Sequence, residues 1–136
     1  MRFTFQIEIA RPPEEVFAYL ADPSHLPEWQ ESAVEVRVED DRFHEVRKAF
    51  GRRLESVLEV EERDAPRRFV VRTIEGPLPI RAEHDLEPAA DGTRLSVAVE
   101  GEPGGMLGPA TRLLVRGAER QFKGDFARLK RILESR

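Results

Sequence analysis

The fold is decided by residues 3–29, which read FTFQIEIARPPEEVFAYLADPSHLPEW. The opening residues alternate apolar and polar side chains, which is the period of a strand with one buried face. The two prolines and two glutamates at 12–15 favour a helix start, because proline is tolerated in the first turn and carboxylates are stabilised by the positive end of the helix dipole. Asp22 and Pro23 repeat this signal, with aspartate as the expected cap, and predict a second short helix that runs to Trp29.

Farther along the chain, an apolar period of two recurs in six more segments. Short turns are expected at Asp40-Asp41, at 63–66, at Gly76-Pro77 and at Asp91-Gly92, and strands joined by short turns pair antiparallel. The residues expected to share a face within each strand are Val34, Val36 and Val38; His44, Val46, Lys48 and Phe50; Leu54, Ser56, Leu58 and Val60; Phe69, Val71 and Thr73; Leu78, Ile80, Ala82, His84 and Leu86; and Leu95, Val97 and Val99.

A long helix is predicted to end the chain. After the glycine-rich stretch 101–108, which we expect to be a connector that can act as a gate, apolar residues step by three or four over about 25 to 30 positions. These residues are Leu107, Ala110, Leu114, Ala118, Phe122, Phe126, Leu129 and Leu133. The elements together predict an α+β fold, with a seven-stranded curved antiparallel sheet, two short helices after the first strand and a long C-terminal helix across the sheet.

Composition narrows the class of protein. A chain of 136 residues with 40% apolar and 35% charged side chains is expected to form one globular domain, residues 1–136. The longest aliphatic run, at 113–115, cannot cross a bilayer, and the N-terminus lacks the continuous apolar stretch of a secretory signal, so a cytoplasmic location is expected. The absence of cysteine excludes disulfides, thiolate nucleophiles and thiolate metal sites.

The net charge of −4 is unevenly distributed. Residues 106–136 contain eight basic and three acidic side chains, so this segment carries about +5 and the rest of the chain about −9. Arg112, Arg116 and Arg120 lie four residues apart on one helical face, with Lys123 nearby. Such a stripe suits phosphates or an anionic lipid surface, although a solvated helix face is the favoured interpretation. No aromatic residues suited to base stacking are interleaved with it, so no nucleic-acid partner is expected.

The order of elements resembles the helix-grip fold of the START-like, or SRPBCC, superfamily, which is Bet v 1-like. Residues 9–17, IARPPEEVF, and 22–29, DPSHLPEW, are similar to the opening signature of its polyketide cyclase/dehydrase-like branch. The resemblance covers essentially the whole chain and implies a cavity between the sheet and the C-terminal helix, with its mouth near the short helices. Because members include lipid carriers, quinone binders and cyclases, the resemblance implies no particular catalytic residue.

Three polar residues are expected on inward faces: Ser56, Thr73 and His84. His84 suits acid/base chemistry by its pKa range, but a histidine that is hydrogen-bonded inside a core explains the same placement. Glu83 and Asp85 point to the other face and cannot assist it. His25, His44 and His84 are too far apart in sequence for a metal motif, so neither a metal nor another cofactor is expected.

The predicted ligand-binding residues come from the inward faces and the two ends of the cavity. Trp29 either lines the entrance or packs on the sheet edge, and Phe122 and Phe126 face the sheet as core or as cavity wall. Gly117 and Gly124 suggest a close approach to the helix, or are simply tolerated. The predicted set is Phe17, Leu20, Leu26, Trp29, Ser56, Leu58, Phe69, Val71, Thr73, Ala82, His84, Leu114, Ala118, Phe122 and Phe126.

Three functions follow from these features. The first is the binding or carriage of a small hydrophobic molecule such as a lipid, a quinone or a polyketide-like aromatic compound. The second is a cyclase, dehydratase or isomerase that uses His84 as its acid/base with Ser56 or Thr73 orienting the substrate. The third is an interaction module that uses the basic helix or an exposed edge strand, and a homodimer is possible.

Overall fold

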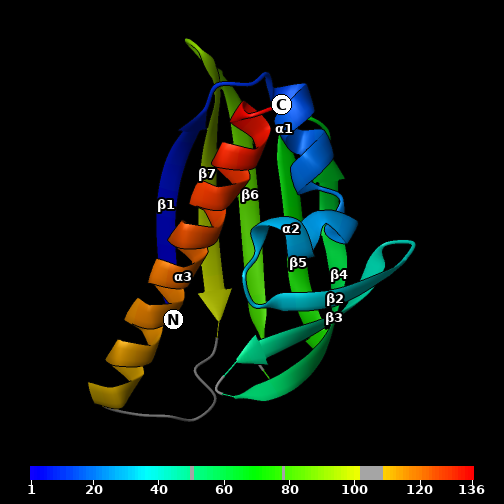
Figure 1. The fold of residues 1–136 in the computed structure, drawn as a ribbon, viewed down its shortest axis with the longest axis vertical. Coiled ribbons are helices and arrows are strands. Elements are labelled where there is room, and N and C mark those ends of the chain that lie inside the picture. The colour runs from blue at the N-terminus through cyan, green and yellow to red at the C-terminus, as the bar shows by residue number, and fades with distance from the viewer. Residues whose placement is uncertain (50, 78, 102–108) are drawn as a thin grey trace.

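A computed structural model describes residues 1–49, 51–77, 79–101 and 109–136 of the chain. The predicted order of elements is confirmed (Figure 1). The elements are β1 (Arg2–Ile9), α1 (Pro13–Leu20), the 3-10 helix η1 (Pro23–His25), α2 (Leu26–Trp29), β2 (Ala33–Glu39), β3 (Arg42–Ala49), β4 (Arg52–Asp64), β5 (Arg68–Glu75), β6 (Ile80–Ala89), β7 (Gly92–Gly101) and α3 (Pro109–Glu134). Phe50, Leu78 and the expected connector at 102–108 lie outside the described residues.

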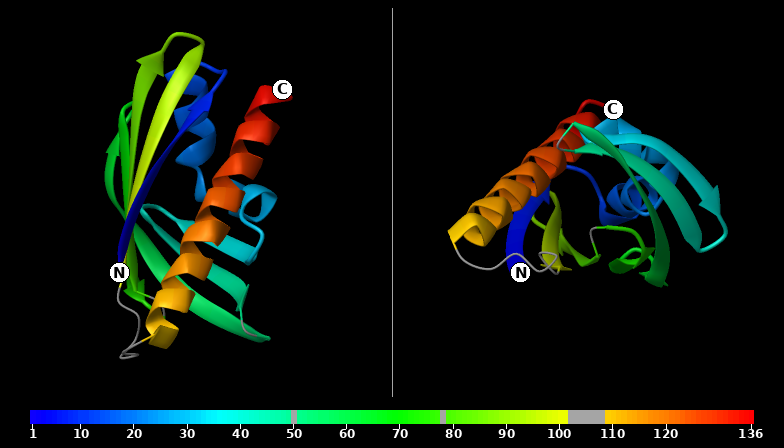
Figure 2. Two further views of the ribbon diagram at one scale, coloured as in Figure 1. Left: turned by 90° about the vertical axis from the view of Figure 1, so that its left-hand side faces the viewer. Right: turned by 90° about the horizontal axis from the view of Figure 1, so that it is seen from below.

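The strands form one antiparallel sheet in the order β1-β7-β6-β5-β4-β3-β2. The sheet curves strongly, and the β2–β3 hairpin turns toward the side on which the helices lie (Figures 1 and 2). Helix α3 runs along this inner side, beside β1, with α1 and α2 next to its C-terminal half. The architecture is the predicted α+β helix-grip fold.

The two short helical segments begin where the sequence indicates. Pro13 is the first residue of α1, and Glu14 and Glu15 occupy its first turn. Asp22 caps η1, because its carboxylate accepts hydrogen bonds from the backbone N–H of Ser24 at 3.0 Å and from the Ser24 hydroxyl at 2.7 Å. The helical segments form the connection between β1 and β2, at residues 10–32, and lie on the inner side of the sheet (Figure 2).

An aromatic seam joins the C-terminal half of α3 to the sheet. The Phe126 ring lies 4.9 Å from Trp29, 5.4 Å from Phe5 and 5.7 Å from His84, measured between centroids, and is only 1% exposed. Leu129 and Leu133, one and two turns on, are fully buried. Aromatic pairs in edge-to-face geometry add to the free energy of burial, so this half of α3 is firmly packed.

The end of α3 is also tied to the corner between β1 and α1. The Arg11 guanidinium donates to the backbone carbonyls of Glu134 at 2.9 Å and Arg136 at 2.6 Å, and the Ala10 N–H donates to the Glu134 carboxylate at 2.8 Å. The Lys130 ammonium donates to the Glu8 carbonyl and to the Glu134 carboxylate. These bonds satisfy carbonyls that a helix C-terminus otherwise leaves unpaired.

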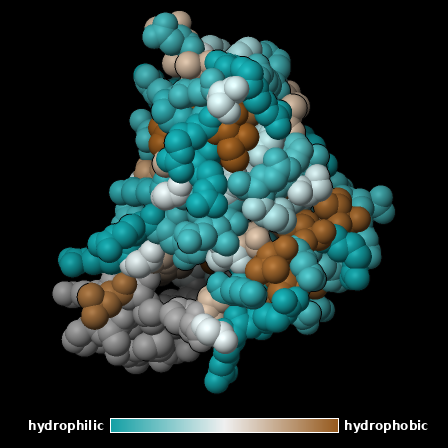
Figure 3. Space-filling view, viewed as in Figure 1, coloured by the Kyte–Doolittle hydropathy of each residue, from teal (hydrophilic) through white to brown (hydrophobic). Residues whose placement is uncertain are grey.

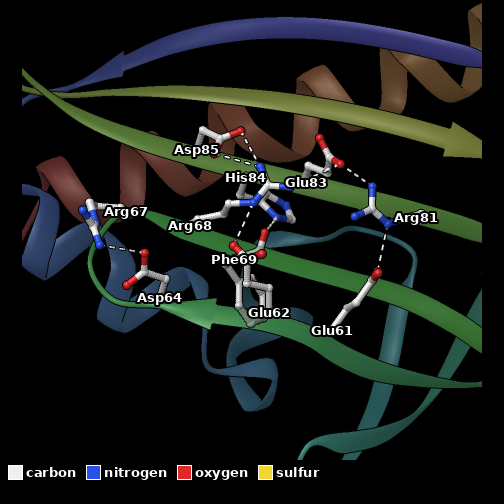
Figure 4. A network of polar contacts seen from close by, with 10 residues as sticks. All are labelled: Glu61, Glu62, Asp64, Arg67, Arg68, Phe69, Arg81, Glu83, His84 and Asp85. Carbon is white, nitrogen blue, oxygen red and sulfur yellow. Dashed lines mark hydrogen bonds and ion pairs between the residues drawn. The ribbon is translucent and has the colours of Figure 1, made fainter.

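The outer face of the sheet is covered by ion pairs. Arg68 on β5 contacts Glu62 at 2.9 Å and Asp85 at 3.0 Å, and Arg81 on β6 bridges Glu61 and Glu83 (Figure 4). The pairs of Arg68 link β5 to its neighbours β4 and β6, and those of Arg81 lie within β6 and reach across β5 to β4, all on the solvent side, as the predicted alternation of β6 requires. Figure 4 also shows His84 directed away from this network, toward Phe69. Exposed pairs of this kind contribute little each to stability, but they match the strands in register.

Strand β3 differs from its sequence pattern. The alternation suggested His44, Val46 and Lys48 as a common face, but the residues on the inner side are Phe43 and Glu45, which pair across from Leu58 and Ser56. Phe43 and Glu45 are both buried, at 3% and 5% exposure. A hydrophobic pattern assigns a glutamate to the solvent side. Because Glu45 is buried, the pattern of β3 predicts the wrong face as the inner one.

Gly92 is required at the hairpin between β6 and β7. It has φ +155°, and a Cβ at this position would lie 2.1 Å from the Ile9 carbonyl oxygen and 2.7 Å from the Arg11 nitrogen. The chain leaving β1 therefore passes directly against this glycine.

We expect Gly92→Ala to lower the free energy of unfolding by about 3 kcal/mol or more, because strain and a backbone clash are combined. Gly51→Ala is the matched control, since Gly51 also has a positive φ of 70° but a Cβ added there would have no atom within 4 Å. Gly51→Ala should cost about 1 kcal/mol. Urea denaturation measures both, and equal costs would contradict the explanation.

Candidate functional site

The inner face of the sheet is closed at one end and open at the other. At the end covered by α1, the inward residues Ile9, Leu86 and Leu95 are at most 5% exposed. At the opposite end, where β4 and β6 begin and β5 ends, the inward residues Ser56, Thr73 and Ile80 are partly exposed. The facing part of α3 presents Ala118 and Phe122, which are also partly exposed. Figure 3 shows hydrophobic residues exposed over the β2–β3 hairpin on the same face, where Val34 and Val38 are 37% and 43% exposed.

The predicted ligand-binding residues divide between these two regions. Those with at most 9% exposure, packed in the core, are Phe17, Leu20, Leu26, Trp29, Leu58, Phe69, Val71, Ala82, His84 and Phe126. Those that remain partly exposed at the open end are Ser56, Thr73, Ala118 and Phe122. The side chains of Leu114 and Arg112 lie outside what the structure describes.

Trp29 lies in the core and not at the surface. Its ring is 1% exposed, packs edge-on against Phe126, and its indole N–H has no acceptor among the described residues. A buried donor without a partner costs about 1–3 kcal/mol. The aromatic seam offsets this cost, so Trp29 fixes α2 against α3.

His84 has the environment of a core histidine. Its Nδ1 lies 2.9 Å from the Phe69 carbonyl oxygen, and its ring lies 5.7 Å from the rings of both Phe69 and Phe126. The Phe69 carbonyl can only accept, so Nδ1 carries the proton. Burial lowers the pKa of His84 to about 4, although the hydrogen bond to Phe69 acts in the opposite direction. The imidazole is therefore neutral near pH 7.

The three inward polar residues do not converge. His84 on β6, Phe69 on β5 and Arg63 on β4 form one row across the sheet. Ser56 lies on β4 as well, but seven residues before Arg63. At roughly 3.3 Å per residue, Ser56 and the row that contains His84 are about 20 Å apart along the strand. The Thr73 hydroxyl accepts a hydrogen bond from the Ile80 N–H at 3.2 Å, across the β5–β6 connection.

A polar cluster that the sequence does not reveal lies on the inner side of β3. Glu45 and Arg47 form a two-point ion pair, with Nε to Oε1 at 2.8 Å and Nη2 to Oε2 at 3.0 Å. Arg47 also donates to the Ser32 hydroxyl at 2.9 Å and to the Gln30 side-chain oxygen. Its guanidinium thus fastens β3 to the segment that leads from α2 into β2. The only signal in the sequence is the spacing of two opposite charges by two residues on one strand.

Asp125 of α3 holds the same segment from the other side. Its carboxylate accepts the Glu31 N–H at 3.2 Å, and the side chain is buried, with 7% exposure. Burial raises the pKa of Asp125, while the Glu31 hydrogen bond and the charges of Arg47 and Arg128 oppose this shift. Residues 30–32 are therefore clamped between the sheet and α3, beside the open end.

Two hollows open to solvent lie near this region. One, of about 790 Å³, is lined by β2, β3, β4 and the end of β5, and includes inward-facing Glu45 and Ser56 together with outward-facing Glu35 and Arg37. The other, of about 380 Å³, lies between α3 and Glu31. No group of histidines and carboxylates within the described ranges is arranged to hold a metal ion. Among the same residues, no helix is both long and apolar enough to cross a membrane.

Comparison with known proteins shows the family and the fold. The signature of one protein family, described as polyketide cyclase / dehydrase and lipid transport, matches residues 1–134. No curated protein matches the chain.

Solved structures share the fold at low sequence identity. A conserved protein from Geobacillus kaustophilus is 19% identical, with a TM-score of 0.80 over 99% of this chain and 96% of its own. A protein from Deinococcus radiodurans is 21% identical, with a TM-score of 0.77 over 98% of each chain. Ara h 8.0201 is 15% identical, with a TM-score of 0.79 over 100% of this chain and 99% of its own. The seven-stranded sheet with a long C-terminal helix is thus a Bet v 1-like fold.

The buried neutral His84 should make stability depend on pH. Its pKa is about 4 in the folded state, against an ordinary value of 6.5, so between these values the unfolded chain binds more protons. The free energy of unfolding should therefore fall by about 3 kcal/mol between about pH 7 and pH 4 through this residue alone. His84→Asn keeps an N–H donor for the Phe69 carbonyl and cannot titrate. Urea denaturation across this range should show a smaller slope for the variant, and an equal slope would exclude the assignment.

The Glu45–Arg47 pair should be stabilising only as a pair. We expect Arg47→Met to cost about 3 kcal/mol, because it leaves a buried carboxylate without its partner, and Glu45→Leu/Arg47→Met to recover most of this loss. Arg53→Met removes an exposed pair with Glu35, whose nitrogen–oxygen distance is 3.4 Å. That control should cost less than about 1 kcal/mol by the same measurement. A double variant as unstable as Arg47→Met would count against this account of the cluster.

Proposed function

The chain belongs to the polyketide cyclase/dehydrase and lipid transport family, and on this premise we propose that it binds a small hydrophobic molecule between the sheet and α3. The binding region is the open end of the inner face. Its walls are the inward residues of β4, β5 and β6 on one side and the first half of α3 on the other. Membership in the family and the fold support a hydrophobic ligand, such as a lipid, a quinone or a polyketide-like aromatic compound.

The observation that carries the proposal is the partial exposure of inward side chains under α3. Phe122 contacts Phe3 edge-on at 5.4 Å between centroids and still remains partly exposed. A helix that only completed the core would bury Phe122 and Ala118 as fully as it buries Phe126 and Leu129. Apolar surface left exposed on a concave face is typical of a ligand site.

The polar groups at the open end would orient a bound ligand. Ser56 lies across from Glu45 on the inner face, and the Glu45–Arg47 pair lies at the β3 side of the open end. A ligand with an apolar body and one polar group would place the apolar body against Phe122 and the polar group toward β3. Sites for small molecules combine apolar walls with a few polar groups in this way.

Catalysis by His84 is not favoured by the geometry. The residue is buried in the aromatic seam, its Nδ1 is occupied by the Phe69 carbonyl, and Ser56 lies far along the sheet. An acid/base residue must come within hydrogen-bonding reach of its substrate. We therefore propose binding or carriage without a reaction at His84.

Blocking the open end should abolish binding without unfolding the protein. Ala118→Trp places a large ring in the space between α3 and the sheet, whereas Gln121→Trp places the same ring on an exposed position of the same helix. We expect native mass spectrometry of the protein from its own source to show a copurified small molecule for the wild type and for Gln121→Trp. Ala118→Trp should lose at least about 90% of it while its thermal unfolding stays cooperative. Equal retention by both variants would place the ligand elsewhere.

A further inference from the structure

The side of α3 that faces away from the sheet is defined here as its outer face. Phe122, Phe126, Leu129 and Leu133 mark the inner side of the helix. By helical spacing, the opposite side carries an unbroken stripe without a carboxylate. This stripe consists of Leu113, Gly117, Arg120, Gly124, Ala127 and Arg131, and it is flanked by Arg116, Lys123 and Arg128. Figure 2 shows α3 on the outside of the molecule along its length.

The arginines of the outer face differ from those at the centre of the sheet, on β5 and β6, although Arg42 and Arg52 on β3 and β4 also have no ion pair among the described residues. On the sheet, Arg68, Arg72 and Arg81 all contact carboxylates. In the part of the chain that the structure describes, Arg116, Arg120, Arg128 and Arg131 have no carboxylate within ion-pair distance. Lys123 has one partner, Glu119, on its own helix at 3.5 Å. The positive charge of α3 is therefore left for a group outside the chain.

The two glycines of the stripe have no role inside the fold. Each costs about 1 kcal/mol relative to alanine within a helix. A Cβ at Gly117 or at Gly124 would meet no atom within 4 Å, so no neighbouring element requires their small size. Their absent side chains instead leave the groove of about 380 Å³ that Arg120, Gln121 and Arg128 line together with Glu31 and Asp125. The groove therefore presents two arginines together with the carboxylates of Glu31 and Asp125.

Leu113 adds an apolar contact to the same face. It is 70% exposed, which makes it the most exposed large apolar side chain among the described residues. It lies on the stripe, two turns before Arg120, on the part of α3 next to the open end. A single exposed leucine on a basic helix face can add an apolar contact to the attraction between the arginines and anionic headgroups.

From these features we infer that the outer face of α3 docks on a membrane that contains anionic phospholipids. Arg116, Arg120 and Arg131 contact headgroup phosphates, and Leu113 enters the apolar boundary. At a Debye length of about 8 Å, only the near face of the protein senses the membrane, so the net charge of −4 does not prevent docking. Docking on a membrane rests on and extends the proposed function, because the hydrophobic molecules that the protein is proposed to bind are held in bilayers.

Other occupants fit the outer face less well. A second copy of α3 in either direction would bring arginines against arginines, which is unfavourable at an interface. Single-stranded nucleic acid is bound through stacking on aromatic rings, and the aromatic residues of α3, Phe122 and Phe126, lie on its inner side.

Vesicle sedimentation tests the inference on the whole chain. Vesicles of phosphatidylcholine with about 30% phosphatidylglycerol should bind the protein at about 0.05 M salt and release it at about 0.5 M, and pure phosphatidylcholine should not bind it. Arg116→Gln/Arg120→Gln should weaken binding about 30-fold. Arg42→Gln/Arg52→Gln makes the same change in net charge at exposed arginines of β3 and β4 and should leave binding within about 2-fold.

A second variant tests the apolar contact. Leu113→Ser should weaken vesicle binding about 10-fold, whereas Val38→Ser, at an exposed valine on β2, should not change it. The inference is overturned if anionic vesicles do not bind, if both double variants weaken binding equally, or if the protein binds poly-glutamate or duplex DNA but not vesicles. Ala118→Trp separates the two functions, since it should lose the copurified ligand and retain vesicle binding. Loss of the ligand site alone would leave this docking surface intact.

Discussion

The structure depends on the contact between Phe126 and the sheet. This ring meets Trp29, Phe5 and His84 at once, so it links α3 to α2, β1 and β6 within one cluster. The bonds of Arg11, Lys130 and Glu134 then fix the end of the same helix to the β1–α1 corner. Because both sets of contacts lie in its C-terminal half, α3 is anchored at one end, whereas Ala118 and Phe122, farther toward its N-terminus, stay partly exposed.

This uneven anchoring explains where the candidate site lies. The closed end is filled by buried apolar side chains from α1, β6 and β7. At the other end, the Glu45–Arg47 pair and Asp125 hold residues 30–32 between β3 and α3. A charged pair inside a curved sheet is costly to desolvate, and its hydrogen bonds to Gln30 and Ser32 offset part of that cost. The site therefore has one apolar side and one polar side.

The sequence predicts the elements well and the site only in part. Alternation correctly identifies the inward residues of β4 and β6, and the start signals at Pro13 and Asp22 locate the short helices. Alternation shows which face of the sheet a residue lies on, but not its position along the strand direction. The sequence therefore predicts Ser56 and His84 in one site, although the strand register places them about 20 Å apart. The Glu45–Arg47 cluster is not predicted from the sequence because Gln30 and Ser32, which accept hydrogen bonds from Arg47, come from another segment that only the folded chain brings near. The burial of His84 is likewise set by Phe126, far along the chain.

The division of α3 into an anchored half and a free half has a consequence for how such a protein diversifies. Residues from Phe126 onward are constrained by many neighbours, so a change there is felt throughout the core. Residues 115–121 are all partly or fully exposed, so their side chains can be exchanged at a smaller cost in folding free energy. The C-terminal half of α3 is thus constrained by the core, and the N-terminal half is free to vary. Selection can change which ligand is bound by changing residues in the N-terminal half, without altering the packing of the fold.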